Sequence, residues 1–395
     1  MAPEFDAPAF DALAFDALTE QGLRAAGSLK WTRYGDALGA FVAEMDVGTA
    51  PAVTRALREA VDVAAFGYLP AATQSAMAEA CAAWQADRHG WEVPAEWVRP
   101  IADVLAGLQV AITHLTPPGS PVVLPTPAYM PFLQVPGELG REVIEVPMVP
   151  GEDGRLSYDL AGLDRAFAAG GRLLVHVDPH NPVGRVWTEA EQLAVAEVVE
   201  RHGARVFSDT VHAPLVYPGA VHRPYASLSP VTAAHTVTAT SASKAWNVPG
   251  LKCAQLVLSN EADAVLWARV GERPEHGCST LGAIATTAAY SEGAGWLADV
   301  LTYLDGNRML LAELLADRLP QVRYTPPEGT YLAWLDCRDL GIDGPPGEFF
   351  LREAGVALID GRECGLAGAG HVRLTLATPR PVLRTIVDRM AAALA

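Results

Sequence analysis

The sequence predicts an α/β protein with a large doubly wound, mostly parallel sheet domain and a smaller α+β domain. Three observations lead to this prediction. Short apolar runs alternate with amphipathic helical stretches after residue 50. The chain has 395 residues, which suits two or three domains, or one large and one small domain. Half of the residues are apolar and 19% are charged, a composition typical of globular proteins.

The predicted elements follow one another in a regular order. A proline near its start predicts a helix over 51–65, and an alanine-rich amphipathic pattern predicts another over 73–89. A further helix is expected over 108–115, directly after Gly107. Apolar and β-branched runs predict the buried strands, at 122–124, 172–177, 205–208 and 236–240, and a helix over 189–202 separates the second from the third.

The last hundred residues predict the smaller unit. It contains one long helix, at 296–319, and three strands, at 331–335, 356–358 and 372–376. We therefore expect an N-terminal arm and part of the small domain in residues 1–46, the large domain in 47–290, and the C-terminal small domain in 291–395.

The N-terminus repeats a Phe-Asp-Ala triplet every five residues, beginning at Phe5, Phe10 and Phe15. A period of five fits neither a helix nor a strand. We therefore expect a loose arm that packs only against another surface.

Charge and cysteine usage exclude several classes of protein. The chain has 29 Lys+Arg against 46 Asp+Glu, a net charge of −17, which argues against nucleic acid or an anionic membrane as the main partner. No apolar stretch is long enough to span a membrane, and the acidic N-terminus does not resemble a secretion signal. The five cysteines form no C-x-x-C pair, which favours reduced thiols in the cytoplasm over disulfides or zinc.

Lysine is rare in this chain: only Lys30, Lys244 and Lys252 occur, whereas the other basic residues are arginines. Arginine does not lose its proton in a protein, but lysine can, and it then becomes a nucleophile or forms an imine. A lysine that persists in such a chain is therefore a candidate for chemistry, although chance accounts for it equally well at any one position.

Three polar residues follow consecutive predicted strands: Asn181, Asp209 and Lys244. The carboxyl ends of parallel strands meet at one edge of a sheet, so these side chains should lie close together. Each residue alone has an ordinary structural explanation, but an amide, an acid and a lysine in this order match the needs of pyridoxal 5′-phosphate. Its aldehyde forms an imine with a lysine, and an acid keeps its ring nitrogen protonated.

A phosphate also needs donors. Ser241, Ser243 and Lys252 flank Lys244, and the helix expected after Gly107 offers free N–H groups at its start. Tyr129 is placed to stack on a flat ring.

Rival motifs are weaker. Ser241 to Lys244 also matches the S-x-x-K of penicillin-recognising enzymes, but those need a later K-T-G and no lysine follows Lys252. The glycine-rich segment 365–370 does not spell a dinucleotide-binding motif, and the histidines show no metal-ligand spacing. His180 and His212 are of interest only because they lie at the same strand ends as Asn181 and Asp209.

With these motifs the chain resembles the fold-type I pyridoxal-phosphate enzymes of the aminotransferase class I/II superfamily. The similarity is greatest to the cystathionine β-lyase or carbon–sulfur lyase branch, the MalY/PatB group, and runs from about Gly27 onward. The segments that carry it are Lys30-Trp31, Val42 to Asp46, Phe66 to Tyr68, Pro179 to Arg185, Ser208-Asp209 with His212, Ser241 to Lys244 with Asn247 and Gly250-Leu251, and Arg373 to Arg380.

The resemblance implies a role for each candidate residue. Lys244 would form the imine with the cofactor and move protons, Asp209 would pair with the ring nitrogen, and Arg373 would bind the substrate α-carboxylate. The remaining cofactor contacts would come from Asn181 and His212 at the ring hydroxyl, Tyr129 on the ring face, and Gly107, Leu108, Ser241 and Lys252 at the phosphate. Tyr68 would reach the phosphate of a neighbouring subunit, which implies a homodimer with shared sites.

The resemblance implies a lyase that cleaves L-cystathionine or related S-substituted L-cysteines to a thiol, pyruvate and ammonia. An aminotransferase, which moves an amino group between an L-amino acid and a 2-keto acid, would use the same residues and remains an alternative. A cofactor-binding regulatory protein is a third reading, but it would need a basic recognition module that the chain does not show. The roles of Lys30, Cys364 and the Phe-Asp-Ala arm stay open at this point.

Overall fold

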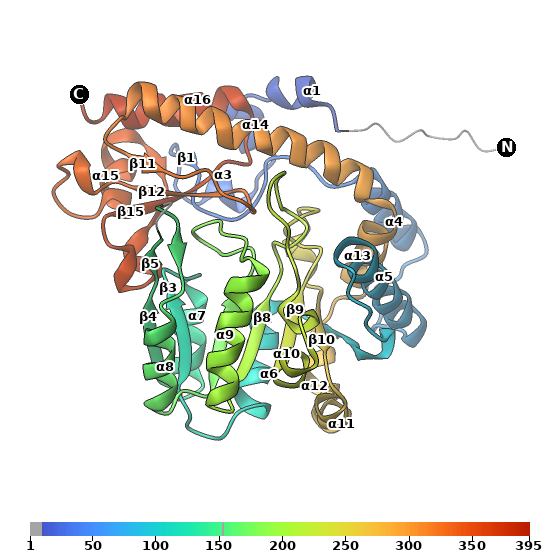
Figure 1. Cartoon of the computed structure of the whole chain (residues 1–395). Helices are drawn as coiled ribbons and strands as arrows, with labels where there is room; N and C mark the ends of the chain where they lie inside the picture. Colours follow the sequence, from blue (N-terminus) through green and yellow to red (C-terminus); the bar gives the residue numbers. More distant parts are fainter. Residues whose placement is uncertain (1–9, 152–153) are drawn as a thin grey trace.

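The computed structural model describes residues 10–151 and 154–395, which form one large sheet, one smaller sheet and the helices around them (Figure 1). The large sheet has seven strands, in the spatial order β2 (Val98–Ile101), β10 (Ala254–Leu258), β9 (Thr236–Thr240), β8 (Arg205–Asp209), β7 (Leu173–Val177), β3 (Val122–Thr126) and β4 (Val143–Pro147). Strands β9, β8, β7, β3 and β4 run parallel, and β10 is antiparallel to both of its neighbours. The predicted doubly wound sheet is confirmed.

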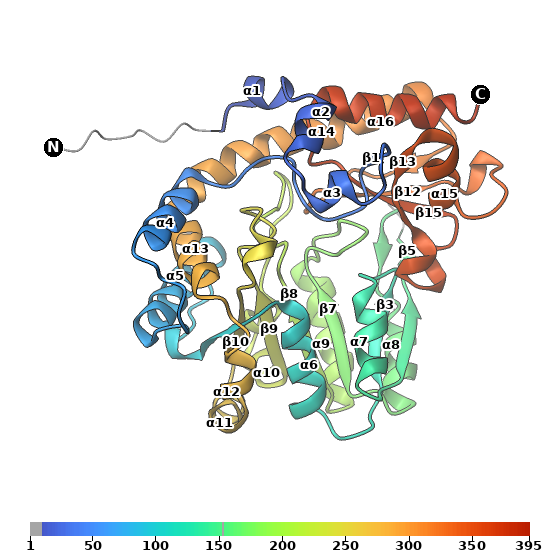
Figure 2. The same ribbon diagram turned by 180° about the vertical axis from the view of Figure 1, so that it is seen from behind.

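Helices cover both faces of this sheet, which explains why its strands are continuously apolar. Figure 1 shows α8 (Leu160–Ala168), α9 (Glu189–Arg201) and α10 (Pro230–His235) on one face, and Figure 2 shows α6 (Val104–His114) and α7 (Pro131–Glu138) on the other. Every residue of β3, β7 and β9 is buried. A parallel strand shielded on both faces needs apolar side chains at successive positions rather than alternate ones.

The C-terminal part of the chain builds a second, antiparallel sheet. Its order is β11 (Arg323–Tyr324), β12 (Leu332–Asp336), β15 (His371–Thr375) and β14 (Ile359–Asp360). The N-terminal segment joins this unit, because β1 (Leu38–Gly39) pairs with β13 (Val356–Ala357). The pair β5 (Val149–Pro150) and β6 (Leu156–Ser157) forms a separate hairpin.

The remaining helices lie at or just below the top, on both sides and at the lower right of the molecule in Figure 1. They are α1 (Ala12–Asp16), α2 (Glu20–Ala25), α3 (Leu29–Thr32), α4 (Pro51–Asp62), α5 (Ala71–His89), α11 (Glu261–Val270), α12 (Glu272–Glu275), α13 (Thr280–Glu292), α14 (Ala294–Arg318), α15 (Pro346–Phe349) and α16 (Arg380–Ala392). Helix α13 crosses the boundary expected at residue 290, and the division into 1–46, 47–290 and 291–395 stays a prediction. Within the described residues no helix is long and apolar enough to cross a membrane.

Two sequence expectations were wrong. The helix expected to begin after Gly107 begins at Val104, because Asp103 caps it through its side chain, which accepts a hydrogen bond from the Ala106 N–H at 3.0 Å. The strands β2, β4 and β10 were missed. Strand β2 contains Pro100, which disfavours a strand in a sequence pattern but is tolerated at the edge of a sheet.

The loose arm expected at the N-terminus is also corrected for the described residues. The second and third Phe-Asp-Ala repeats bracket the short helix α1, and Phe10 and Phe15 pack edge-on against Tyr303 of α14 at ring-centroid distances of 5.4 and 5.2 Å. Asp16 accepts hydrogen bonds from the Tyr303 hydroxyl and from the Arg380 N–H. The second and third copies of the repeat therefore pack against a surface of the same chain. The first copy, at Phe5, lies outside the described residues.

A buried ion pair fixes the N-terminal segment to the rest of the protein. The Lys30 Nζ lies 2.8 Å from the Asp46 Oδ2, and their side chains are 0% and 2% exposed. Lys30 also donates to the Ala377 carbonyl at 3.2 Å, and the Trp31 Nε1 donates to the other Asp46 oxygen at 2.7 Å. Lys30 is therefore a structural charge that holds α3 against the segment 43–46.

We expect Lys30→Met to lower the free energy of unfolding by roughly 3–5 kcal/mol, because it leaves the Asp46 carboxylate buried without its cation. Arg55→Ala serves as the control, since it removes an ion pair with Glu292 whose side chains are 49% and 56% exposed. That change should lower the same quantity by about 1 kcal/mol or less. Urea unfolding monitored by tryptophan fluorescence compares the two variants, and equal losses would contradict the assignment.

Candidate active site

A cavity of about 470 Å³ lies at the carboxyl ends of the parallel strands, between the large sheet and the segments of the chain's two ends. It brings together most of the residues that the sequence singled out. Those that line it are Tyr129, Asn181, Asp209, His212, Ser241, Ser243, Lys244, Lys252 and Arg373. Asp209 ends β8, whereas Asn181 and Lys244 follow β7 and β9, so the strand order itself produces this convergence.

Lys244 is a partly buried residue whose amine has no ion-pair partner among the described residues. Its Nζ donates to the Ala43 carbonyl at 2.9 Å, and the Tyr331 hydroxyl donates to the same carbonyl at 3.0 Å. Burial, reinforced by the charge of Arg373, lowers the pKa of Lys244 to about 8, although Asp209 and Glu44 oppose the shift. The amine can therefore give up its proton close to neutral pH.

Asp209 is a buried carboxylate that also lacks an ion-pair partner in the described chain. One oxygen accepts the Val211 N–H at 3.0 Å. Burial raises the pKa of Asp209 to about 7, and the Val211 hydrogen bond and the charge of Lys244 offset only part of that effect. A cationic N–H donor placed against this carboxylate would keep it ionised.

His212 is held in place by a strained neighbour. Its Nδ1 lies 2.9 Å from the hydroxyl of Thr330, and burial lowers the pKa of His212 well below its usual value, so the ring stays neutral. Thr330 has a φ of +65°, which a β-branched residue rarely adopts. The Thr330 N–H donates to the Leu215 carbonyl at 2.7 Å, which helps to hold this conformation.

Arg373 has unused hydrogen-bonding capacity inside the cavity wall. Its Nη1 donates to the Asn181 Oδ1 at 3.1 Å and its Nη2 donates to the Phe41 carbonyl at 2.7 Å. Its Nε is buried and has no partner among the described residues. A buried guanidinium without a carboxylate suits a site that receives an anionic group from a ligand.

The end of the cavity near Ser241 and Lys252 is suited to binding an anion, although the carboxylate of Asp103 also lies there. Ser241 accepts the Ser243 N–H at 3.0 Å and donates to the Cys253 carbonyl at 2.8 Å. Val104 and Leu105, the first residues of α6, line this end, so the positive end of the helix faces it. Lys252 lies there as well, although its Nζ pairs with the Asp103 Oδ2 at 3.0 Å, a contact that a bound phosphate would compete for.

The cavity lining does not include two residues that the sequence had assigned to it. Gly107 and Leu108 were expected at the phosphate, but because α6 begins at Val104 they lie one turn further along the helix. Leu108 is fully buried in the core, and Gly107 packs against Ile101 and Leu256, so neither lines the cavity. Tyr68, expected at the phosphate of a neighbouring subunit, is 94% exposed and lines a separate pocket beside His276, and its role stays a prediction.

Sequence reasoning missed contributions that carry no motif. The Ala43 carbonyl is a backbone group, and Thr330 and Tyr331 reach His212 and this carbonyl only because the C-terminal unit folds over the large sheet. The Val42 to Asp46 segment had been noted, but nothing in its residue types signals a carbonyl aimed at Lys244. The position of Asp103 at the start of α6 could have been predicted from the sequence, because aspartate is a preferred N-cap residue.

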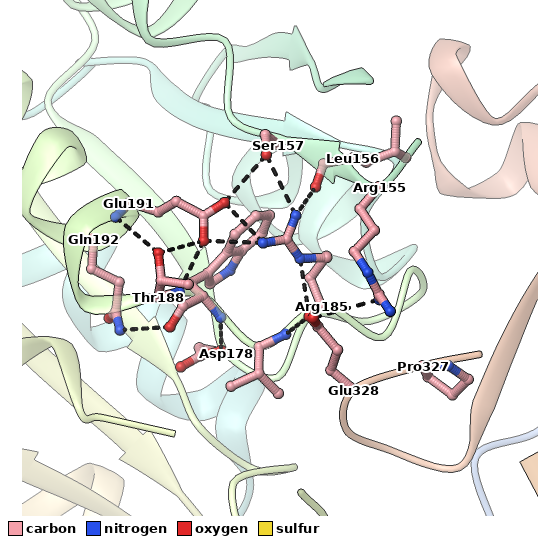
Figure 3. Close-up of polar contacts among 12 residues, drawn as sticks. Arg155, Leu156, Ser157, Asp178, Arg185, Thr188, Glu191, Gln192, Pro327 and Glu328 are labelled. Atoms are coloured by element: carbon pink, nitrogen blue, oxygen red, sulfur yellow. Dashed lines mark hydrogen bonds and ion pairs between the residues drawn. The ribbon is translucent and has the colours of Figure 1, made fainter. Parts of the chain in front are cut away.

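A polar network beside the cavity fastens the segment that carries Thr330 (Figure 3). The Arg185 Nε donates to the Glu328 Oε2 at 3.0 Å, and its Nη2 donates to the Glu191 Oε1 at 2.8 Å. The Glu328 side chain also accepts the Val186 N–H at 3.0 Å. Since Gly184 has a φ of +72° and a Cβ there would lie 2.3 Å from Pro327, only glycine permits this approach.

The described residues contain no cluster of His, Cys, Asp and Glu that could hold a metal ion. They do fit pyridoxal 5′-phosphate. The cavity supplies an amine of lowered pKa, a buried acid without a cation and an anion site, together with Tyr129, whose ring lies in the cavity wall. The roles of the individual residues toward this group remain predictions.

Comparison with known proteins supports the same kind of site. The family described as aminotransferase class I and II matches residues 42–390. A Mycobacterium tuberculosis protein provisionally named cystathionine β-lyase is 41% identical over 93% of this chain and 94% of its own. The cystathionine β-lyase of Corynebacterium glutamicum is 38% identical over 93% of this chain and 96% of its own.

The fold is shared with a solved structure from Corynebacterium diphtheriae, provisionally described as a PLP-dependent β-cystathionase. It is 41% identical in sequence and has a TM-score of 0.90, with 95% of this chain and 98% of that chain covered.

The raised pKa of Asp209 gives the cofactor-free protein a pH dependence with a definite sign. The native state holds a proton that the unfolded state releases above about pH 4, so this contribution to stability is present below pH 4 and is lost as the pH rises through about 7. Asp209→Asn should therefore remove up to about 4 kcal/mol of pH dependence from the free energy of unfolding. Urea titrations of the apoprotein between pH 4 and 8 measure it.

Asp343→Asn, which changes an exposed carboxylate, is the matched control and should leave the slope as it is in the wild-type protein. If Asp209→Asn gives the same slope as this control, the carboxyl of Asp209 is not the group whose titration destabilises the protein.

Proposed function

The chain belongs to the aminotransferase class I and II family, and on that premise we propose that it is a pyridoxal 5′-phosphate-dependent carbon–sulfur β-lyase of the cystathionine β-lyase type. Its reaction would convert L-cystathionine and water to L-homocysteine, pyruvate and ammonia. The observation that carries the proposal is the pairing, in one cavity, of a partly buried Lys244 of lowered pKa with a buried Asp209 that has no cationic partner among the described residues. The names of the relatives favour the lyase over the aminotransferase.

The cofactor, when bound, supplies an aldehyde that condenses with amines and a protonated ring that accepts an electron pair from the substrate α-carbon. Lys244 would hold the cofactor through its Nζ and, once displaced by the substrate amine, would remove the α-proton. Its pKa of about 8 leaves a useful fraction of the amine uncharged at neutral pH.

The other side chains of the cavity bind and orient. Asp209 would hold a proton on the ring nitrogen, while Asn181 and neutral His212 would lie at the ring hydroxyl and Tyr129 on the ring face. Arg373 would take the substrate α-carboxylate, using the guanidinium N–H that has no partner among the described residues. The start of α6, Ser241 and Lys252 would hold the phosphate.

The function is tested by its products. The holoenzyme should release pyruvate, ammonia and a free thiol from L-cystathionine with no keto acid present, whereas strict dependence on a keto acid would make it an aminotransferase. We expect Lys244→Ala to abolish turnover and Asp209→Ala to lower it by orders of magnitude, roughly a hundredfold or more.

Borohydride reduction of the holoenzyme should shift its visible absorption and leave the label on the Lys244 peptide after proteolysis. Lys252→Ala is the control for lysine loss, because it should weaken cofactor binding and leave the label on Lys244. A Lys244→Ala enzyme that retains substantial lyase activity would sink the assignment.

We also propose that the protein is a homodimer in which Tyr68 serves the partner's cavity. Tyr68 is 94% exposed, and the neighbouring Val63 and Phe66 are 77% and 63% exposed, so this stretch presents apolar side chains that the described part of the chain leaves uncovered. Cytoplasmic location is proposed from the five cysteines, all of which are free and buried.

Subunit mixing tests the shared site. Lys244→Ala and Tyr68→Phe variants should each be impaired, yet co-refolding them should restore activity, because one site of each mixed dimer would carry both native residues. If mixing restores nothing while both variants form dimers, Tyr68 does not act across the interface.

A further inference from the structure

The active-site cavity has two parts that come from different regions of the chain. The inner part is built by the strand ends of the large sheet and contains Lys244, Asp209 and the anion site. The outer part is built by the N-terminal segment and the C-terminal unit, which contribute Leu29, Arg33, Tyr34, Phe41, Ile359 and Glu363. Since the proposed cofactor accounts for the inner part, the outer part faces whatever extends beyond the substrate β-carbon.

The outer part carries one cation and one anion that the proposed mechanism does not use. Arg33 and Glu363 both line the cavity, and both residues are exposed. Neither forms an ion pair with any residue in the described part of the chain. Their neighbours differ in this respect, because Arg362 pairs with Asp360 and Glu348.

Hydrogen bonds and an ion pair hold the backbone at Arg33 and Glu363 in place. Arg33 directly follows α3, which the buried Lys30–Asp46 pair and Trp31 hold in place, and its guanidinium lies 5.7 Å from the centre of the Tyr34 ring. Glu363 lies in a short helical turn that its own Oε1 caps by accepting the Asp360 N–H at 3.3 Å. The next residue, Cys364, accepts the Ala128 N–H through its carbonyl at 2.8 Å, which ties the turn to the large sheet.

Glu363 is also electrostatically close to the predicted α-carboxylate site. Burial lowers the pKa of Arg373, and the carboxylate of Glu363 is among the groups that oppose this shift. Arg373 and Glu363 both line the cavity, so Glu363 lies near a substrate whose α-carboxylate meets Arg373. The apolar side chains of Phe41, Met130 and Ile359 in the same lining suit a thioether chain.

We propose that Arg33 and Glu363 form a subsite for a second amino-acid zwitterion, in which Arg33 binds the distal carboxylate and Glu363 the distal ammonium of an S-substituted L-cysteine. The inference rests on the proposed lyase function and names its substrate class: thioethers whose second arm ends in an amino acid, as in L-cystathionine. A plain S-alkyl cysteine gives neither charge a partner. The basis of selectivity is therefore the matching of both charges, since opposite charges that meet at a partly desolvated rim discriminate between ligands.

Four substrates that differ in their distal charges distinguish the contribution of Arg33 from that of Glu363. S-ethyl-L-cysteine has no distal charge, S-(2-aminoethyl)-L-cysteine has a cation, S-(2-carboxyethyl)-L-cysteine has an anion, and L-cystathionine has both. The measurement is kcat/KM for pyruvate release by the holoenzyme of the wild-type protein, Arg33→Gln and Glu363→Gln. Glutamine retains much of each side chain and, at 363, the oxygen that caps the Asp360 N–H.

Arg33→Gln should lower kcat/KM roughly tenfold for the two substrates with a distal carboxylate, as expected for loss of a charge-assisted hydrogen bond. Glu363→Gln should do the same for the two substrates with a distal ammonium. S-ethyl-L-cysteine is the internal control for folding and for any effect on Arg373, and its kcat/KM should stay within about twofold in both variants. Arg362→Gln, an adjacent arginine outside the cavity lining, should change none of the ratios.

The outcomes separate this inference from the proposed function. If the wild-type holoenzyme releases pyruvate from none of the four substrates, the lyase function itself is wrong. If it cleaves them but each variant lowers all four equally, or lowers none, the lyase stands and the zwitterion subsite is overturned. A change confined to the substrates with matching charge supports the subsite.

Discussion

The structure is organised around one constraint: the amine of Lys244 must stay buried and close to losing its proton. An ion pair with a carboxylate would keep that amine charged, and the described chain gives it a backbone carbonyl instead. The Ala43 carbonyl is shared with Tyr331, so the amine, the N-terminal segment and the C-terminal unit meet at a single oxygen. Asp209 and Arg373 then set the electrostatics around it, the first raising the pKa of Lys244 and the second lowering it.

The cavity keeps this arrangement because two polar clusters fix its walls. The Lys30–Asp46 pair holds α3 and the segment 43–46, while Arg185 and Glu328 hold the segment that leads to Thr330, whose hydroxyl contacts His212. Both clusters join residues far apart in the sequence, and both are fully or partly buried. Removing one partner would leave the other charge without compensation, so each cluster favours a single position of the wall it holds.

The elements that the sequence predicted well are those whose physics is local. Strands β7, β8 and β9 are short and are covered on both faces of the sheet. Each is therefore a continuous run of apolar or β-branched residues, which can be recognised from its own few residues. Strands β2 and β10 were missed because their pairing depends on distant partners, and Pro100 obscures the first. The start of α6 was misplaced because Gly107 was taken as a boundary, whereas Asp103 caps the helix.

By itself the sequence determined which chemistry the cavity can hold. The order of Asn181, Asp209 and Lys244 along a parallel sheet brings an amide, an acid and an amine to one edge, because successive strands of this sheet end on the same side. Tertiary structure decided the rest: that the Ala43 carbonyl holds Lys244, that Lys30 is a structural charge, and that Arg33 and Glu363 share one rim. Every residue has a backbone carbonyl, so the sequence does not show which one will accept a hydrogen bond from Lys244. The partner of a charged side chain is likewise decided only when distant segments pack together.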